Sequence, residues 1–324
     1  MKLNWHVPIS ILLALPAVHI GCVLAQSYPA RPVHIVVPFA AGGAVDTAAR
    51  LVGPRLADAL KQPVIVDNRP GAGGNIAADS VAKSAADGYT ILLTTNGHAI
   101  SPAIYRKLPF DAVKDFIPVT QLLASTLILV ATPGLPAASV KEFIALAKSR
   151  PGALNYGSTG IGNPLHLAME LLKLSAGLDI VQVPYKGDAP LNAALMAGEV
   201  QVAVVPLLTS LPHVRSGRLR ALGITNAKRA TPLPDLPTVG ESVPGYESAS
   251  WLGMFVPART SREIVDLLQQ ETARALNLPE VKNRLNSLGY EVVASAPQEF
   301  DAKFRADIET FRKIVREARI PVQD

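Results

Sequence analysis

Residues 33–46 read Val33-His34-Ile35-Val36-Val37-Pro38-Phe39-Ala40-Ala41-Gly42-Gly43-Ala44-Val45-Asp46 and carry the strongest structural signal in the chain. The first five are mostly β-branched and predict a buried β-strand. Asp46 stands where a side chain can cap a helix, which we expect to run to about Leu60. The turn at 38–43 therefore offers backbone N–H groups beside a helix N-terminus, an arrangement typical of anion sites.

A second glycine-rich turn lies at residues 156–162, which read Tyr-Gly-Ser-Thr-Gly-Ile-Gly. It also follows an apolar strand pattern and precedes a helix pattern, expected from about 164 to 175. Since the two turns are more than a hundred residues apart, we expect two lobes that each supply one side of a single site. The hydroxyls of Ser158 and Thr159 can donate to a carboxylate, so the predicted ligand is a small carboxylate.

Length and composition agree with a two-lobed protein. The 324 residues exceed what one core usually covers. The formal net charge is +5, and Lys and Arg are scattered along the chain. This balance suits the attraction of small anions and does not predict a nucleic-acid-binding surface.

The first 25 residues are expected to be a signal peptide. The apolar run at 7–24 follows a lysine, and small or apolar residues suit cleavage after Ala25. A lipid anchor on Cys22 and an uncleaved anchor remain as alternatives. The signal peptide would direct export, and its cleavage would remove the only cysteine, so no disulfide is expected.

The order of strand and helix patterns predicts an α/β protein. Runs at 64–66 and 89–95 read as strands followed by turns and helices, which favours a parallel sheet with ligands beyond its carboxyl ends. A second unit begins after a strand at 127–131. From Ser261 onward two or three amphipathic helices are expected to pack on the first unit, so the chain crosses twice and the crossings form a hinge. The helix after the first glycine turn is expected to kink or divide at Pro54.

No cofactor or metal is predicted. Neither glycine turn matches the dinucleotide fingerprint, and no P-loop lysine follows either turn. The histidines beyond the leader share no helical face, so a metal site is not expected. They are His34, His98, His166 and His213.

A serine-type hydrolase acting on a small ester or amide remains an alternative function. Ser80 and Lys83 have the S-x-x-K spacing of acyl-serine enzymes, but the companion motifs of those enzymes are missing. Ser158 is the other candidate nucleophile. No G-x-S-x-G turn is present to expose either serine.

Several segments carry a resemblance to a known family. They are Tyr28-Pro29-Ala30-Arg31-Pro32, Val36-Val37-Pro38-Phe39 with Gly42, Gly43 and Asp46, Val66-Asp67-Asn68-Arg69-Pro70-Gly71-Ala72-Gly73-Gly74-Asn75, Pro184-Tyr185-Lys186-Gly187 and Leu236-Pro237-Thr238-Val239. In these segments the chain resembles the Bug family of periplasmic solute receptors, which serve tripartite tricarboxylate transporters. The resemblance covers essentially all of the chain after the leader.

The resemblance implies a fold and a set of partners. The fold is a two-lobed periplasmic binding protein of type II, a Venus flytrap with a mixed sheet in each lobe. Lobe 1 would comprise 26–128 and 251–324, and lobe 2 would comprise 129–250. The implied protein is a monomeric periplasmic receptor without catalytic activity, which binds a small organic acid and delivers it to a tripartite membrane permease. Whether a membrane sensor kinase is a further partner stays open.

The resemblance also implies the ligand-binding residues. On the first side they are Phe39, Ala41, Gly42 and Asp46, with Thr95 and Asn96 nearby. On the second side they are Ser158, Thr159 and Gly162, with Tyr185 and Lys186 at the edge. Many relatives carry an acidic residue where this chain has Val205, so we predict a carboxylate with an apolar or aromatic body rather than an amino acid.

Overall fold

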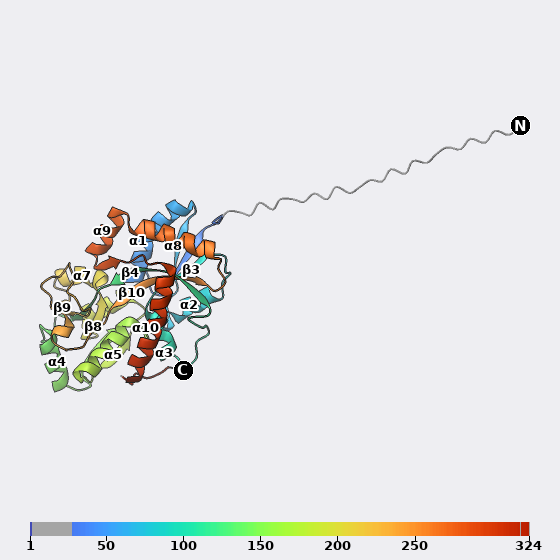
Figure 1. Cartoon of the computed structure of the whole chain (residues 1–324). Helices are drawn as coiled ribbons and strands as arrows, with labels where there is room; N and C mark the ends of the chain where they lie inside the picture. The colour runs from blue at the N-terminus through green and yellow to red at the C-terminus, as the bar shows by residue number, and fades with distance from the viewer. Residues whose placement is uncertain (2–27, 318, 324) are drawn as a thin grey trace.

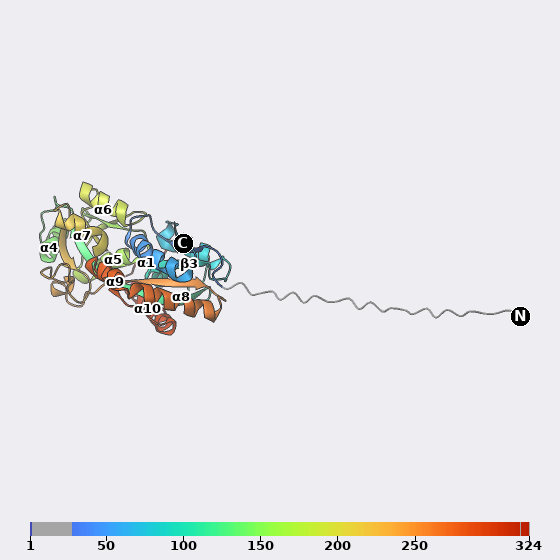
Figure 2. The same ribbon diagram turned by 90° about the horizontal axis from the view of Figure 1, so that it is seen from above.

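The structure is a computed structural model that describes residues 1, 28–317 and 319–323. The predicted cleavage after Ala25, the alternative at Cys22 and the apolar run at 7–24 lie outside the described residues. In the described part of the chain two lobes lie side by side, each built on one β-sheet with helices packed around it (Figures 1 and 2). No helix in this part is both long and apolar enough to cross a bilayer.

Lobe 1 contains a six-stranded sheet in the order β11-β4-β10-β3-β1-β2. Its strands are β1 (Val33–Val37), β2 (Val64–Asn68), β3 (Thr90–Thr95), β4 (Phe116–Ser125), β10 (Ser250–Pro257) and β11 (Tyr290–Val292). Its helices are α1 (Ala44–Leu60), the 3-10 turn η1 (Ala72–Gly74), α2 (Asn75–Ala82), α3 (Gly97–Ile104), α8 (Arg262–Leu276), α9 (Pro279–Ser287) and α10 (Pro297–Glu317). Strand β1 pairs in parallel with β2 and β3, whereas β10 pairs antiparallel with β3 and β4.

Lobe 2 contains a five-stranded sheet in the order β7-β6-β8-β5-β9. Its strands are β5 (Leu127–Ala131), β6 (Asn155–Ser158), β7 (Val181–Pro184), β8 (Val202–Pro206) and β9 (Arg220–Ile224). Its helices are α4 (Val140–Ser149), α5 (Pro164–Ala176), α6 (Asp188–Ala197), α7 (Leu207–Arg215) and the 3-10 turn η2 (Val239–Glu241). Strand β6 is parallel to β7 and β8, and β5 is antiparallel to β8 and β9. The predicted fold, two lobes with a mixed sheet in each, is confirmed.

The chain passes between the lobes at two points. Strand β4 ends in the first sheet at Ser125 and β5 begins in the second sheet at Leu127, so Thr126 is the first crossing. The chain returns between β9 and β10. Asn226 ties the crossings together, because its Oδ1 accepts a hydrogen bond from Leu127 N at 3.0 Å and its Nδ2 donates to Ser125 O at 3.3 Å. The residue boundaries of the two lobes, 26–128 with 251–324 and 129–250, stay a prediction.

Some elements differ from the expectation. Helix α1 is not divided at Pro54, because Val52 and Leu56 on either side are buried in the lobe 1 core and hold the helix in place. Strands β4 and β10 were not predicted, although they are the two long strands beside each other in the middle of the first sheet. All eight residues of β10 are buried, so this strand lacks the alternation of polar and apolar residues that marks a half-exposed strand. The three helices α8, α9 and α10 confirm the expected helical return to the first lobe.

A phenylalanine cluster encloses His98 on α3. The imidazole centroid lies 4.6 Å from the ring centroid of Phe116, 5.0 Å from that of Phe255 and 5.4 Å from that of Phe304. Among the described residues, no group hydrogen-bonds to the buried Nε2. Burial lowers the pKa of His98 to about 3, so the ring is a neutral core group rather than a general base.

We expect the stability of the protein to fall with acidification through this histidine. The unfolded chain binds a proton at His98 with a pKa near 6.5, while the folded chain does not bind it until about pH 3. The His98→Leu variant has no imidazole to protonate in the unfolded chain, so it does not lose this stability on acidification. The free energy of unfolding of the variant relative to the wild type should therefore rise by about 2 kcal/mol between pH 7 and pH 5. Urea unfolding at the two pH values measures this change, and a difference that is independent of pH would contradict the prediction.

Candidate functional site

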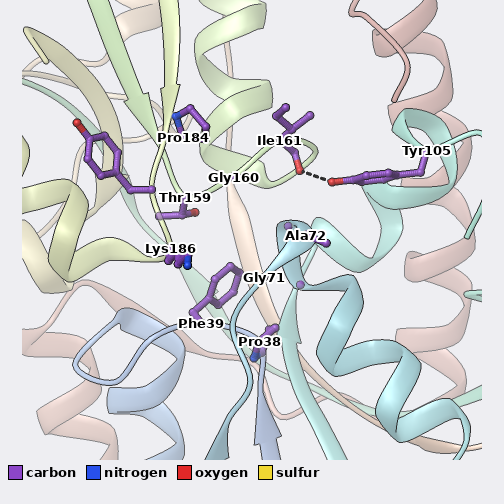
Figure 3. Close-up of a pocket in the computed structure, with 13 residues that line it drawn as sticks. Pro38, Phe39, Gly71, Ala72, Tyr105, Thr159, Gly160, Ile161, Pro184 and Lys186 are labelled. Atoms are coloured by element: carbon purple, nitrogen blue, oxygen red, sulfur yellow. Dashed lines mark hydrogen bonds between the residues drawn. The ribbon is translucent and has the colours of Figure 1, made fainter. Parts of the chain in front are cut away.

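Two adjoining cavities lie between the lobes and share the side chains of Phe39 and Thr159. The outer cavity has a volume of about 320 Å³ and is drawn in Figure 3. It is lined by Pro38, Phe39, Gly71, Ala72, Gly73, Gly74, Tyr105, Thr159, Gly160, Ile161, Pro184, Tyr185 and Lys186. The inner cavity is small, about 30 Å³, and is lined by Phe39, Ala44, Val45, Thr95, Ser125, Leu127, Thr159, Pro164, Leu165, Asp188, Pro206, Ser250 and Leu252.

The turn between β1 and α1 supplies Phe39 and is fixed by Asp46. The Asp46 carboxylate accepts hydrogen bonds from Gly42 N at 2.9 Å, Arg50 Nε at 3.0 Å and Asn68 Nδ2 at 3.0 Å. Asn68 Nδ2 also donates to Phe39 O at 3.0 Å. Burial raises the pKa of Asp46, but these hydrogen bonds outweigh it and the pKa lies below its usual value. Asp46 therefore shapes the turn and does not line either cavity.

A glycine loop between β2 and α2 forms the wall of the outer cavity opposite lobe 2. Gly71, Ala72, Gly73 and Gly74 all have positive φ, at 133°, 47°, 65° and 108°. The loop needs glycine because a Cβ on Gly73 would lie 2.5 Å from Ile161 O of lobe 2. Tyr105, which directly follows α3, closes the same edge, where its hydroxyl donates to Ile161 O at 3.1 Å (Figure 3).

The turn between β6 and α5 supplies the lobe 2 side. Thr159 is buried, lines both cavities and has no hydrogen-bond partner for its hydroxyl among the described residues. Ser158 is buried below it, and its Oγ accepts a hydrogen bond from Gln182 Nε2 at 2.7 Å. Asn163 caps α5 by accepting hydrogen bonds from Leu165 N and His166 N, so these two amides are not free for a ligand.

The backbone at the start of α1 is approached by a carboxylate from the other lobe. Asp188, the first residue of α6, accepts a hydrogen bond from Ala44 N through Oδ2 at 2.8 Å. Beside it, Ala40 N donates to Lys186 O at 3.4 Å. Burial raises the pKa of Asp188 to about 6, although the Ala44 hydrogen bond opposes the shift. Asp188 was not among the predicted site residues, since a lone acid after a glycine is an ordinary first-turn residue of a helix.

The structure brings together some of the predicted site residues and separates others. Those lining a cavity are Phe39, Thr95, Thr159, Tyr185 and Lys186. Those lining neither of the two cavities are Ala41, Gly42, Asp46, Asn96, Ser158, Gly162 and Val205. Val205 is fully buried in the lobe 2 core, where it pairs with Ile128 across β8 and β5.

Residues that the prediction omitted complete the lining. The seryl hydroxyls of Ser125 and Ser250 and the helix start at Ala44 and Val45 come from segments without a distinctive motif. Ser125 and Ser250 end and begin the two strands that were not predicted, so no sequence signal placed them at the seam.

The candidate nucleophiles and metal ligands have structural partners instead. Ser80 donates to Ala77 O within α2, and Lys83 pairs with Asp79. Among the described residues no histidine hydrogen-bonds to Ser158, and no group of three His, Cys, Asp or Glu side chains is placed to hold a metal. His166 Nδ1 accepts a hydrogen bond from Gly162 N at 3.3 Å, which requires an unprotonated nitrogen.

Comparisons with known proteins agree across most of the chain. A family model described as tripartite tricarboxylate transporter family receptor matches residues 48–319. Protein BugT of Bordetella pertussis is 36% identical over 298 residues, which are 91% of this chain and 91% of BugT.

Two solved structures are similar in sequence and fold. R. palustris Rpa4515 with adipate is 38% identical with a TM-score of 0.89, covering 91% of this chain and 100% of that one. MatC from Rhodopseudomonas palustris with bound malate is 33% identical with a TM-score of 0.86, covering 89% of this chain and 100% of that one.

We expect Gly73→Ala to force the lobes apart. Its Cβ would meet the Ile161 carbonyl at 2.5 Å, so backbone must move, and the lobe–lobe seam is where it can move. Gly177→Ala is the matched control, because Gly177 has nearly the same φ, 63°, with no atom within 4 Å of the added Cβ. Both variants should lose about 1 kcal/mol of stability from the positive φ. Only Gly73→Ala should increase the radius of gyration in small-angle scattering, and equal radii for the two variants would contradict the predicted clash.

Proposed function

The chain belongs to the tripartite tricarboxylate transporter receptor family, and from this premise we propose that it holds one small organic carboxylate in the seam at Phe39 and Thr159. The Bug-family resemblance noted in the sequence is thereby confirmed, and the protein is a periplasmic carboxylate-binding receptor rather than an enzyme. The observation that carries the proposal is the pair of cavities that both lobes build around these two side chains.

Unpaired donors around the inner cavity support carboxylate binding there. The N–H group of Val45, in the first turn of α1, has no acceptor among the described residues, as expected for a helix N-terminus. Ser125 of lobe 1 and Thr159 of lobe 2 line the same cavity, and each brings a hydroxyl that can donate. A hydrogen bond to a charged group contributes about 1.5 to 3 kcal/mol, so three such bonds approach the roughly 8 kcal/mol of a micromolar Kd before ordering costs.

The ligand class follows from relatives and from the lining. Rpa4515 is solved with adipate and MatC with malate, both small organic acids. Lys186 at the outer cavity adds a positive charge that attracts anions toward the seam. Because the donors come from both lobes, the ligand binds the closed arrangement more tightly than an open one and favours closure.

The closed surface is what a tripartite permease would recognise. We infer a monomer, since the large apolar side chains exposed in the described residues are scattered over elements of both lobes. Apart from Met1 they are Ile65, Ile76, Leu174, Val181, Val293 and Val322. A membrane sensor kinase would read the same surface, and deletion of the permease separates the two roles, because a sensor response survives it and uptake does not.

We also propose that the exported protein begins at Gln26. Cleavage after Ala25 would remove the only cysteine. Intact-mass measurement of the periplasmic fraction should give the mass of residues 26–324, whereas a chain starting at Met1 or a lipidated Cys22 would contradict the cleavage.

Thr159→Val should weaken ligand binding by about 10- to 100-fold, the loss of one hydrogen bond to a charged group. Thr159→Ser keeps the hydroxyl and is the matched control. Titration calorimetry with adipate and malate measures the effect, and scattering with saturating ligand reports closure. If the Thr159→Val protein bound every such acid with the affinity of the wild type, the ligand carboxylate would not contact Thr159 and the proposed position would be wrong.

A further inference from the structure

Asp188 contributes a buried acidic side chain to the lining of the inner cavity. The residue is 8% exposed and lines this cavity. Its Oδ2 accepts the hydrogen bond from Ala44 N across the seam at 2.8 Å. Among the described residues no group donates to Oδ1. One oxygen of the side chain is therefore fixed by lobe 1, and the other has no donor within the described residues.

The charge of Asp188 lacks a cationic partner in the described part of the chain. The nearby Asp46 is already paired with Arg50, and Tyr290 uses its hydroxyl to donate to Ala44 O at 3.0 Å. A buried carboxylate without a counter-charge acts strongly on other charges, because the surrounding dielectric constant is low. A second carboxylate placed beside it would be repelled.

The rest of the inner lining differs in kind from Asp188. Three hydroxyls, from Thr95, Ser125 and Thr159, can donate to an anion, whereas the Ser250 hydroxyl already donates to Asn96 Oδ1 at 2.6 Å. The side chains of Leu127, Leu165 and Leu252 suit a carbon skeleton. Asp188 is the one carboxylate of the inner lining, and a carboxylate only accepts hydrogen bonds, so it would pair with a hydrogen-bond donor on the ligand.

We propose that Asp188 determines ligand specificity, with its Oδ1 accepting a hydrogen bond from a hydroxyl or ammonium group on the bound acid. The receptor then favours monocarboxylates that carry such a donor and disfavours dicarboxylates. This inference rests on the proposed function, since it concerns the ligand held in the same seam.

Asp188, rather than position 205, supplies the acidic or apolar character that a ligand would meet in the inner cavity. The prediction of an apolar or aromatic body rested on Val205 standing where relatives have an acid. Val205 is fully buried and lines neither of the two cavities, whereas Asp188 lines the inner one. An acid is thus present beside the candidate ligand position, and it comes from the start of α6.

The test uses four-carbon acids that differ in one group. The full chain is titrated by calorimetry with butyrate, its 2-, 3- and 4-hydroxy derivatives, 4-aminobutyrate and succinate. Three proteins are compared: wild type, Asp188→Asn and Asp188→Ala. Asn keeps an oxygen for Ala44 N but removes the charge. Asp179→Asn is the control, since Asp179 is an exposed acid on the same lobe and its substitution removes the same charge.

The wild type should bind at least one hydroxy or amino acid 10-fold or more tightly than butyrate and succinate. In Asp188→Asn this preference over succinate should shrink 10-fold or more, and in Asp188→Ala the preference over butyrate should also disappear. Asp179→Asn should leave all ratios unchanged. Comparison of the hydroxybutyrates with 4-aminobutyrate identifies whether Asp188 accepts a hydrogen bond from a hydroxyl or from an ammonium group.

Two results separate this inference from the proposed function. Binding of succinate at least as tight as that of the hydroxy and amino acids in the wild type, or ratios unaltered in Asp188→Asn, would overturn the role of Asp188 while leaving the receptor function intact. No binding by the wild type of any acid in the series, nor of adipate or malate, would overturn both. Thermal melting of each variant confirms that it is folded.

Discussion

The hydrogen bond from Ala44 N to Asp188 Oδ2 joins the two lobes at the start of α1, and the geometry of the seam depends on it. It brings α6 of lobe 2 against the first turn of α1 of lobe 1, so Phe39 and Thr159 face one space from opposite sides. An anion is suited to this position because unpaired N–H groups carry partial positive charge at a helix N-terminus. One such amide is thus used by the protein itself, and that of Val45 remains for a ligand.

The turn between β1 and α1 keeps its shape through hydrogen bonds of side chains that line neither cavity. Asp46 accepts from Gly42 and Asn68, and Asn68 also holds the Phe39 carbonyl. Such a network lets backbone amides serve as the binding groups, because their positions are fixed before a ligand arrives. Some residues of the segments that resemble the Bug family, such as Asp46 and Asn68, therefore hold the binding turn in place but do not themselves line a cavity.

Sequence patterns predicted much of the fold and less of the site. Strand 33–37 and the glycine turns carry local signals, namely β-branched runs, glycine and helix starts, so they could be read directly. Strands β4 and β10 could not, because burial on both faces removes polar alternation. Ser158 and Thr159 are adjacent and chemically alike. Successive side chains at the end of a strand point in opposite directions, so Ser158 contacts Gln182 whereas Thr159 lines the cavities. Asp188 reaches the seam only because the first residue of α6 meets the first residue of α1 across the two lobes, which no local pattern encodes.

Asn226 holds Ser125 and Leu127 on either side of Thr126 with the same amide group. A link of one residue, clamped on both sides, permits rotation but little sliding of one lobe over the other. The crossing at Thr126 thus serves as the pivot of a rigid-body rotation, and a small rotation there moves the far end of each lobe by a much larger distance. Binding of a small acid in the seam would therefore shift the surfaces most distant from Thr126, where a membrane partner would contact the receptor.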